Sequence, residues 1–226
     1  MFLLCSSTLQ FIKEYFLKPL KHIAICGNIG SGKTTLAEKL AKHYGWTPLF
    51  ESVEKNPYLR DFYEDMPRWA FHLQIYFLNS RFRQVNEIRA SEKITVQDRT
   101  IYEDAYIFAA NLRKSGYMTE RDYESYHDIF SSMINFVEPP DLMIYLRADI
   151  PKLVSQIEKR GRDFEYAIRL DYLKNLNERY ETWMQGYDLG RLLIIDVNNL
   201  DFVKNTEDFS FIVNKINLEL NNLFSV

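Results

Sequence analysis

The sequence has little cysteine and no long block of charge of one sign. Only Cys5 and Cys26 occur in 226 residues, which is too few for a disulfide framework or a zinc site and indicates a reducing, cytoplasmic setting. The 28 basic and 31 acidic side chains nearly balance, so the net charge is −3. Because a nucleic-acid-binding surface needs a basic patch, we expect any phosphate-bearing partner to be a small molecule.

The sequence also lacks an apolar run long enough to cross a membrane. Its N-terminus, MFLLCSSTLQFIKEYFLKPLK, starts apolar, but Lys13 and Glu14 interrupt it well before the roughly 20 residues that a spanning helix needs. A signal peptide is the alternative, yet the segment has neither a basic start nor a clear small-residue cleavage site. We interpret residues 1–20 as an N-terminal extension of unknown role and residues 21–226 as a single domain.

Five short apolar runs, rich in β-branched or aromatic residues, alternate with longer segments of helical period. These runs are HIAIC (22–26), WTPLF (46–50), KITVQ (93–97), LMIYL (142–146) and LLIID (192–196). Strands that alternate with helices are typical of a parallel sheet with helices on its faces. The sequence therefore predicts an α/β fold built on a five-stranded parallel sheet.

The segments between these runs carry helix signals of their own. In residues 34–45, leucines recur at helical spacing before Gly45, which suits a left-handed helix cap. The pattern predicts long helices over 66–90 and 119–137, and a further helix from 149 to about 161.

The first four predicted strands are followed by glycine or by a polar residue, and the fifth ends on one. In chain order these residues are Gly27, Glu51, Asp98 with Arg99, Arg147 and Asp196. Ligand sites of open parallel sheets lie outside the carboxyl ends of the strands. We therefore expect all five strand ends to face one site.

The first strand end opens a phosphate-binding motif. The segment GNIGSGKTT fits G-x-x-x-x-G-K-[ST], and it follows a predicted strand and opens a helix, as the motif requires. Lys33 is expected to reach the β- and γ-phosphates of a nucleoside triphosphate, and Thr34 is expected to hold Mg²⁺. The donor is expected to be ATP, and the phosphate-binding residues are Gly27, Asn28, Ile29, Gly30, Ser31, Gly32, Lys33, Thr34 and Thr35.

Glu51, in the loop FESVEKNPYL, bears on the phosphate acceptor. A carboxylate would repel an anionic acceptor, whereas a neutral hydroxyl must lose its proton during transfer, and a positioned acid can accept it. A helix-capping or salt-bridging glutamate is the alternative, and Glu51 alone does not separate the two. Asp98 and Arg99 favour a hydroxyl as the phosphate acceptor. One acid can bind Mg²⁺, while the guanidinium orients Glu51 and the transferring oxygen. An internal ion pair would also account for Asp98 and Arg99.

Several spaced segments together resemble the deoxyribonucleoside kinases, and most closely their bacterial deoxyadenosine and deoxyguanosine kinase branch. These segments are GNIGSGKTT (27–35), ESVEKNPYL (51–59), DRTIYEDAYIFA (98–109), RGRDFE (160–165) and DVNNLDF (196–202). Several motifs in the right order are more specific than any one of them. The resemblance runs from about Lys21 to at least Phe202. It implies a P-loop kinase fold with a lid segment, ATP-dependent phosphorylation of the 5′-hydroxyl of a purine deoxynucleoside for nucleotide salvage, and a homodimer.

The resemblance implies catalytic roles for Glu51, Asp98 and Arg99. Glu51 matches the family's glutamate that contacts the sugar 5′-hydroxyl and is usually taken as the general base. Asp98 and Arg99 match the family's acidic-Arg-Ser/Thr signature, with Thr100 in the third place. Asp98 also matches a carboxylate described both as the base and as the Mg²⁺-side acid, so which acid takes the proton stays open. We favour Glu51.

Contacts to the nucleoside base are implied on the long predicted helix and beyond it. Gln74 matches a glutamine whose amide contacts the base edge through a donor and an acceptor. Arg81 lies seven residues further along the same helix face, and with Asp104 it matches a pair that favours purines. Phe108 matches an aromatic that packs on the base. Gln74, Arg81 and Asp104 each suit more than one base, so the sequence does not rank deoxyadenosine, deoxyguanosine and deoxycytidine.

The sugar and the donor phosphates have implied contacts of their own. Tyr63 and Glu165 match the pair that holds the 3′-hydroxyl, although core packing is the alternative for Tyr63 as it is for Phe108. Arg160 and Arg162 match lid arginines that clamp the donor phosphates. A solvated, charged helix end is the alternative for these arginines.

Two other functions share part of this pattern. A thymidylate-type nucleotide kinase has the P-loop, an Asp-Arg dipeptide and the sheet, but it would carry an arginine beside the acid at the second strand end, where this chain has Phe50. A non-catalytic binding subunit on the same fold would be expected to have lost P-loop or acid residues, and this chain keeps them.

Overall fold

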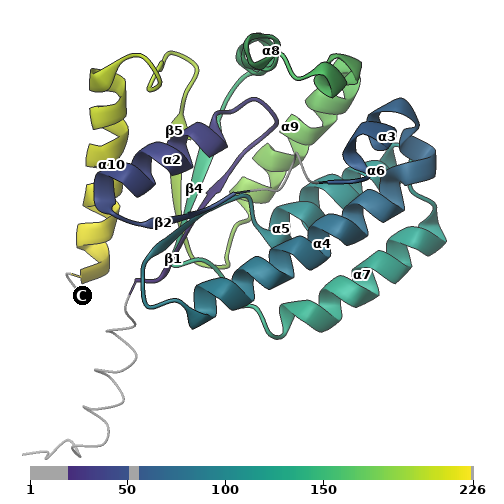
Figure 1. Cartoon of the computed structure of the whole chain (residues 1–226), viewed down its shortest axis with the longest axis horizontal. Coiled ribbons are helices and arrows are strands. Elements are labelled where there is room, and N and C mark those ends of the chain that lie inside the picture. The colour runs from purple at the N-terminus through teal and green to yellow at the C-terminus, as the bar shows by residue number, and fades with distance from the viewer. Residues whose placement is uncertain (1–19, 51–55, 225–226) are drawn as a thin grey trace, which may run out of the picture.

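Five parallel strands pair in the order β2-β3-β1-β4-β5 to form one sheet (Figure 1). They are β1 (His22–Cys26), β2 (Thr47–Leu49), β3 (Thr95–Asp98), β4 (Leu142–Arg147) and β5 (Arg191–Asp196). The structure is a computed structural model that describes residues 20–50 and 56–224. Residues 1–19 of the predicted N-terminal extension and Glu51 lie outside the described residues. The predicted five-stranded parallel sheet is confirmed.

Helices connect the strands and cover both faces of the sheet. They are α2 (Lys33–Tyr44), α3 (Leu59–Glu64), α4 (Met66–Ala90), α5 (Ile101–Glu103), α6 (Ala110–Lys114), α7 (Glu120–Ile134), α8 (Ile150–Arg160), α9 (Leu170–Gln185) and α10 (Thr206–Phe224), with the π-helical turn η1 (Asp104–Ala109) and the 3-10 turn η2 (Asp163–Ala167). Gly45 ends α2 with φ of 75°, the left-handed cap that the sequence predicted, and Gly161 ends α8 with φ of 65°, near where that helix was predicted to end. None of the helices in the described part of the chain is both long and apolar enough to cross a membrane.

Side chains of β1 alternate between two cores because successive residues of a strand point to opposite faces of the sheet. Ile23 and Ile25 lie in a core with residues of α2 and α10, whereas Ala24 and Cys26 lie in a core with residues of α3, α4 and α9. All four side chains are fully buried. In Figure 1, α10 lies to the left of the sheet and α4 and α7 lie to the right, side by side.

The segment after β3 holds the chain beside the carboxyl edge of the sheet. Thr100 caps α5 by accepting from the Glu103 backbone N–H, and the Glu103 side chain accepts from the Thr100 backbone N–H in return. The helix then widens into the π-helical turn η1 before it continues as α6. π-helical turns inside α-helices are frequent at functional sites.

Candidate active site

The phosphate-binding motif forms a loop between β1 and α2. Gly30 and Gly32 have φ of 86° and 95°, a left-handed conformation that residues with side chains rarely adopt. A Cβ on Gly30 would lie 2.7 Å from the Leu153 carbonyl oxygen, and one on Gly32 would lie 2.8 Å from the Phe202 ring. The glycines therefore keep the loop free of side chains where its backbone N–H groups and the α2 N-terminus would meet a phosphate.

Lys33, Thr34 and Asp98 bring a cation and oxygen donors to the end of this loop. The buried Lys33 Nζ donates a hydrogen bond to the Asn28 carbonyl oxygen at 2.9 Å. The Thr34 hydroxyl donates to Asp98 Oδ2. The other Asp98 oxygen, Oδ1, is buried and has no hydrogen-bond partner among the described residues. A hydroxyl beside a carboxylate fits Mg²⁺, which keeps phosphate and water among its oxygen ligands.

Arg99 follows Asp98 in a strained conformation that its neighbours hold in place. Its φ is 71°, the one positive value found for a non-glycine residue in the described ranges. Its backbone N–H donates to the Ile25 carbonyl oxygen at 3.0 Å, and its guanidinium lies 4.2 Å from the centroid of the Phe108 ring. Such strain costs on the order of 1–3 kcal/mol and clusters at functional sites.

Glu103 and Tyr180 support Arg99 from beneath the site. Arg99 Nη1 donates to the Tyr180 hydroxyl at 3.1 Å, and that hydroxyl donates to Glu103 Oε1 at 2.8 Å. Glu103 also accepts from the backbone N–H groups of Gly27 at 3.3 Å and Thr100 at 2.8 Å. Burial raises the pKa of the Glu103 carboxyl, and the nearby Arg99 charge opposes that rise. One buried carboxylate thus joins the first glycine of the phosphate loop to the residue that follows Asp98.

Replacing Tyr180 with phenylalanine is expected to lower the free energy of unfolding by about 1–3 kcal/mol, because Glu103 and Arg99 each lose a buried hydrogen bond. Urea unfolding measures this change. Tyr126→Phe is the matched control, since Tyr126 is equally buried and its hydroxyl has no hydrogen-bond partner among the residues described. Equal losses in the two variants would contradict the supporting role of Tyr180.

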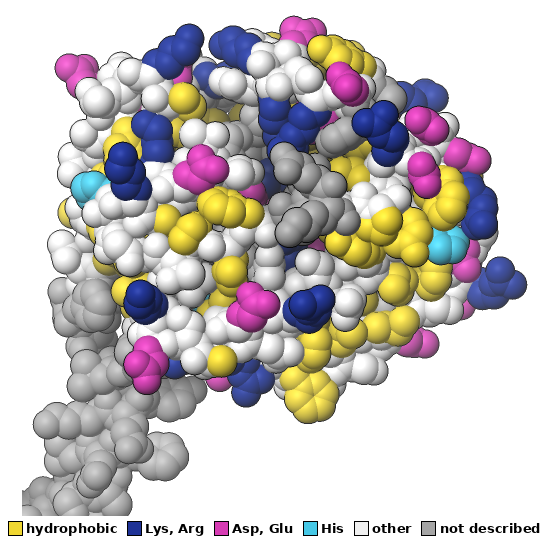
Figure 2. All heavy atoms as spheres, viewed as in Figure 1, with side chains coloured by type: hydrophobic (Ala, Val, Ile, Leu, Met, Phe, Trp, Pro, Cys, Tyr) yellow, Lys and Arg dark blue, Asp and Glu magenta, His cyan; other side chains and the backbone are white. Residues whose placement is uncertain are grey.

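These side chains border a cavity of about 830 Å³, measured to its open mouth. From the predicted phosphate-binding set, Ile29, Gly30, Lys33, Thr34, Arg160 and Arg162 line it. From the predicted substrate set, Tyr63, Gln74, Arg99, Asp104, Phe108 and Glu165 line it, as does Asp98. Figure 2 shows a hollow near the top of the view, below α8, with Lys or Arg side chains inside it. The structure therefore brings most of the predicted residues together.

The end of the cavity next to α4 and η1 carries polar side chains suited to a base edge. Gln74 is buried, and its Oε1 atom has no hydrogen-bond partner among the described residues. Arg81 lies behind Asp104 rather than in the cavity lining, with its Nε atom 3.5 Å from Asp104 Oδ2. An amide and a carboxylate backed by a guanidinium offer both donors and acceptors to a ligand.

Two arginines of the predicted lid contact Glu165. Arg160 donates from Nε to Glu165 Oε2 at 2.9 Å and from Nη2 to Oε1 at 2.6 Å. Arg162 Nη1 lies 3.4 Å from the same Oε1 atom. The sequence predicted phosphate contacts for the arginines and a sugar contact for Glu165, and the structure pairs these side chains with one another.

Two strand ends do not contribute to the cavity. Arg147, at the end of β4, pairs with Glu181 of α9 through Nη2 and Oε2 at 3.1 Å. Asp196, at the end of β5, accepts from the Asn198 backbone N–H at 2.9 Å. The expectation that all five strand ends face one site therefore fails for β4 and β5, because Arg147 finds its partner on α9 and Asp196 finds its partner in the loop after β5.

Sequence reasoning missed some residues of the site. Tyr172 lines the cavity from α9, and Tyr180 of the same helix supports Arg99. No local pattern marks either residue. Glu103 did carry a signal, because Thr100 and Glu103 have the Thr-x-x-Glu spacing of a helix capping box.

Phosphoryl transfer is the chemistry that such a phosphate loop supports, and the fold and the site together define a P-loop phosphotransferase. Comparison with known proteins narrows this class. A family model described as deoxynucleoside kinase matches residues 23–221, and the chain belongs to that family. The family predicted from the sequence is confirmed.

Curated relatives of this chain carry related names. The chain is 37% identical over 207 residues to a deoxyadenosine/deoxycytidine kinase of Bacillus subtilis, which covers 91% of this chain and 95% of the relative. It is 45% identical over 183 residues to a deoxyadenosine kinase of Dictyostelium discoideum, covering 80% of this chain and 74% of the relative. It is 36% identical over 203 residues to a deoxyguanosine kinase of Lactobacillus johnsonii, covering 86% of this chain and 90% of the relative.

A solved structure shares the fold. The deoxyadenosine kinase from M. mycoides with bound dATP superposes with a TM-score of 0.77 at 32% sequence identity, covering 86% of this chain and 98% of that one. The same enzyme with the products dCMP and dCDP bound also has a TM-score of 0.77. The predicted P-loop kinase fold is confirmed, and the chain is a deoxynucleoside kinase.

Proposed function

We propose that this kinase transfers the γ-phosphate of ATP to the 5′-hydroxyl of a purine deoxyribonucleoside, deoxyadenosine or deoxyguanosine, giving the 5′-monophosphate for nucleotide salvage. The observation that carries the proposal is the single cavity that has Lys33 and Thr34 at its phosphate end and Gln74 and Asp104 at its other end. A nucleoside whose base meets Gln74 and Asp104 would direct its sugar toward Asp98 and the phosphate loop. The names of the relatives support a deoxynucleoside as the acceptor.

In the proposed reaction, the 5′-oxygen forms a bond to the γ-phosphorus as the bond to the departing ADP oxygen breaks. The proton of the 5′-hydroxyl goes to a carboxylate, which we assign to Glu51 from its sequence position, since it lies outside the described residues. Mg²⁺, bound with ATP, would offset the charge on the β- and γ-phosphates. Thr34 and Asp98 would hold this ion, and the buried Asp98 Oδ1 atom supports that assignment. Arg99 would orient the acidic groups around the transferring oxygen.

The remaining roles concern the sugar and the lid. Tyr63 and Glu165 would hold the 3′-hydroxyl, and Phe108 would pack against the base. Arg160 and Arg162 would clamp the donor phosphates, and to do so they must exchange some of their present bonds to Glu165. We therefore expect the arginines to move between Glu165 and the phosphates as ATP binds.

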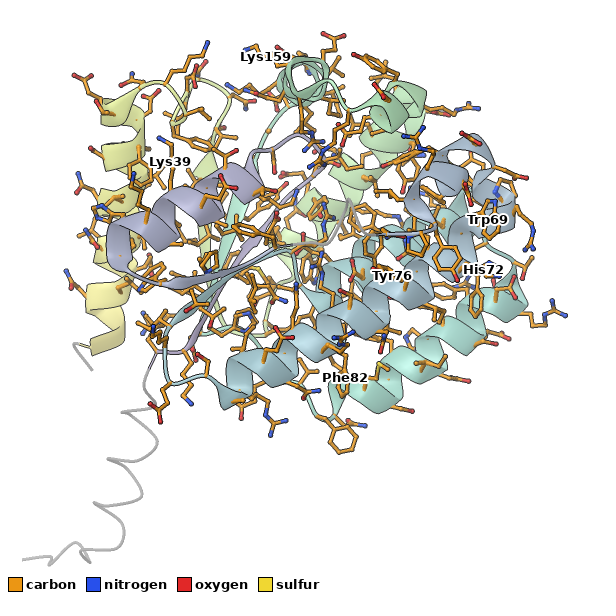
Figure 3. All side chains as sticks on the ribbon, in the orientation of Figure 1. Lys39, Trp69, His72, Tyr76, Phe82 and Lys159 are labelled. Atoms are coloured by element: carbon orange, nitrogen blue, oxygen red, sulfur yellow. The ribbon has the colours of Figure 1, made fainter. Side chains whose placement is uncertain are left out.

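We also propose a cytoplasmic homodimer whose catalytic domain spans residues 21–226. The cytoplasm supplies ATP, and the two cysteines of the chain suit a reducing compartment. A surface for a second copy is available on α4, where Trp69, His72 and Tyr76 project from the helix (Figure 3). The rings of Trp69 and His72 lie 5.4 Å apart, and Tyr58 adds a ring 5.9 Å from Trp69. Aromatic clusters of this kind are enriched at protein interfaces.

A nucleoside panel tests the proposed function. The purified chain is incubated with ATP, Mg²⁺ and each of the four deoxynucleosides, and chromatography measures the 5′-monophosphate that forms. We expect kcat/KM to be highest for deoxyadenosine or deoxyguanosine, with product lost when a chelator removes Mg²⁺. A preference for thymidine, or product formation that is unaffected by the chelator, would contradict the proposal.

A further inference from the structure

A chain of buried polar side chains continues from the base end of the cavity into the protein. Asp104 pairs with Arg81 at 3.5 Å, and Arg81 Nη1 donates to Gln84 Oε1 at 3.2 Å. Gln97 Nε2 donates to the same Gln84 oxygen at 2.8 Å, and the other end of the Gln97 amide lies 2.9 Å from His22 Nε2. All five side chains are at most 8% exposed. The residue at the branch point of this network is Gln84.

The Gln84 amide forms hydrogen bonds through both its oxygen and its nitrogen and is fixed in one orientation. Its oxygen accepts from Arg81 and Gln97, which occupies both lone pairs. Its nitrogen donates at 2.8 Å to the carbonyl oxygen of Phe50, the residue that follows β2. If the amide were turned over, its N–H₂ group would face two donors and its oxygen would face a carbonyl oxygen. The network therefore permits one arrangement of Gln84.

This fixed amide determines how Arg81 is presented. The guanidinium is 1% exposed and is held on one edge by Asp104 and on another by Gln84. A site that discriminates bases by hydrogen bonds depends on donors placed to within a fraction of an ångström. Gln84 is not among the residues that line the cavity, so any effect it has on the substrate must pass through its hydrogen-bond partners Arg81, Gln97 and Phe50.

We propose that Gln84 is a positioning residue for base selectivity: its amide oxygen orients Arg81 behind Asp104, and its amide nitrogen ties that arginine to the end of β2. This proposal rests on the proposed function, a preference for purine deoxynucleosides, and on the family resemblance, which implies that Arg81 and Asp104 favour purines. The network divides the buried hydrogen bonds into two groups. Those of Gln84 reach Arg81, whereas the Gln97 bond to His22 does not.

The test compares Gln84→Met with Gln97→Met. Both variants remove a buried amide of similar size, but only the first removes the acceptor for Arg81 and the donor to Phe50. For each variant, kcat/KM is measured with the preferred purine deoxynucleoside and with deoxycytidine, and KM is measured for ATP. In Gln84→Met we expect the purine-to-deoxycytidine ratio to fall at least about tenfold while KM for ATP stays within about twofold. In Gln97→Met we expect the purine-to-deoxycytidine ratio to stay within about twofold of the wild-type ratio. We expect this even though the thermal unfolding midpoint of Gln97→Met falls by as much as that of Gln84→Met.

An unchanged ratio in Gln84→Met, or an equal loss in both variants, would overturn the proposal. If Gln84→Met does not fold, Gln84→Asn replaces it with the same expected loss, because the shorter amide withdraws its oxygen from Arg81. The nucleoside panel with the wild-type enzyme distinguishes a failure of the proposed function from a failure of the role proposed for Gln84. A wild-type enzyme without purine preference refutes the proposed function, whereas a selective wild type beside an equally selective Gln84→Met refutes only the role of Gln84.

Discussion

Replacing Lys33 with methionine is expected to lower kcat about a thousandfold, because the variant loses the cation that would reach the β- and γ-phosphates as charge develops on them. Methionine has nearly the length of lysine and no charge, so it fills the buried position without a desolvation cost. The hydrogen bond from Nζ to the Asn28 carbonyl oxygen is lost as well. Single-turnover kinetics with saturating ATP and deoxyadenosine measure the effect on the chemical step.

Lys42→Met is the matched control for this substitution. Lys42 lies in the last turn of the same helix, α2, and is exposed. We expect its turnover to stay within about twofold of the wild type, since surface substitutions away from special features have small effects. Comparable turnover in the two variants would mean that the loop between β1 and α2 does not hold the transferred phosphate.

Replacing Glu51 with glutamine is expected to lower kcat at least about a hundredfold while ATP and nucleoside binding are retained. A general base contributes about 10²–10⁴-fold, and an amide keeps the size of the carboxylate but cannot accept the proton. Pre-steady-state kinetics give kcat, and equilibrium titrations with each substrate give the affinities. Turnover like that of the wild type would remove Glu51 from the role of base.

The variant Asp98→Asn distinguishes the role of Asp98 from that of Glu51. In our assignment Asp98 serves Mg²⁺ with Thr34, so this variant is expected to need a higher Mg²⁺ concentration for half-maximal turnover. Glu51→Gln is expected to leave that concentration unchanged. If Asp98→Asn instead lowers kcat at every Mg²⁺ concentration and Glu51→Gln does not, Asp98 is the base.

Much of the fold was predictable because local patterns and tertiary packing agree. The helix predicted over 66–90 has these same bounds, with Asp65 accepting a hydrogen bond from the Arg68 backbone N–H at its start. The second strand is shorter than the predicted 46–50, and hydrogen bonds explain why. The Trp46 N–H donates to Ala41 at the end of α2, and the Phe50 carbonyl oxygen accepts from Gln84. The first is the local bond that accompanies the predicted Gly45 cap, whereas the second joins residues 34 positions apart and has no signature in the sequence.

The site was predictable to the extent that its residues stand in motifs. Lys33 and Asp98 lie in segments that resemble the family, Gln74 matches a glutamine of the family on the long helix, and the structure gathers all three around one cavity. The supporting residues come from elements that no motif marks. Tyr180 stands 81 positions after Arg99, and only the packing of α9 against η1 brings the two together.

The central claim is that the acceptor is a nucleoside hydroxyl and not a nucleotide phosphate. The names of the relatives support this claim, since each is a nucleoside kinase. The sequence position of Glu51 supports it as well, because a carboxylate would repel an anionic acceptor but can take the proton of a hydroxyl.

The most direct measurement is the nucleoside assay run in competition, with equal concentrations of deoxyadenosine and deoxyadenosine 5′-monophosphate, ATP and Mg²⁺. Mass spectrometry then quantifies the monophosphate formed from isotope-labelled deoxyadenosine and the diphosphate formed from the unlabelled monophosphate. We predict that labelled monophosphate is the main product, in at least about tenfold excess. Diphosphate as the main product would contradict the account, because it would mean that the enzyme phosphorylates nucleotides.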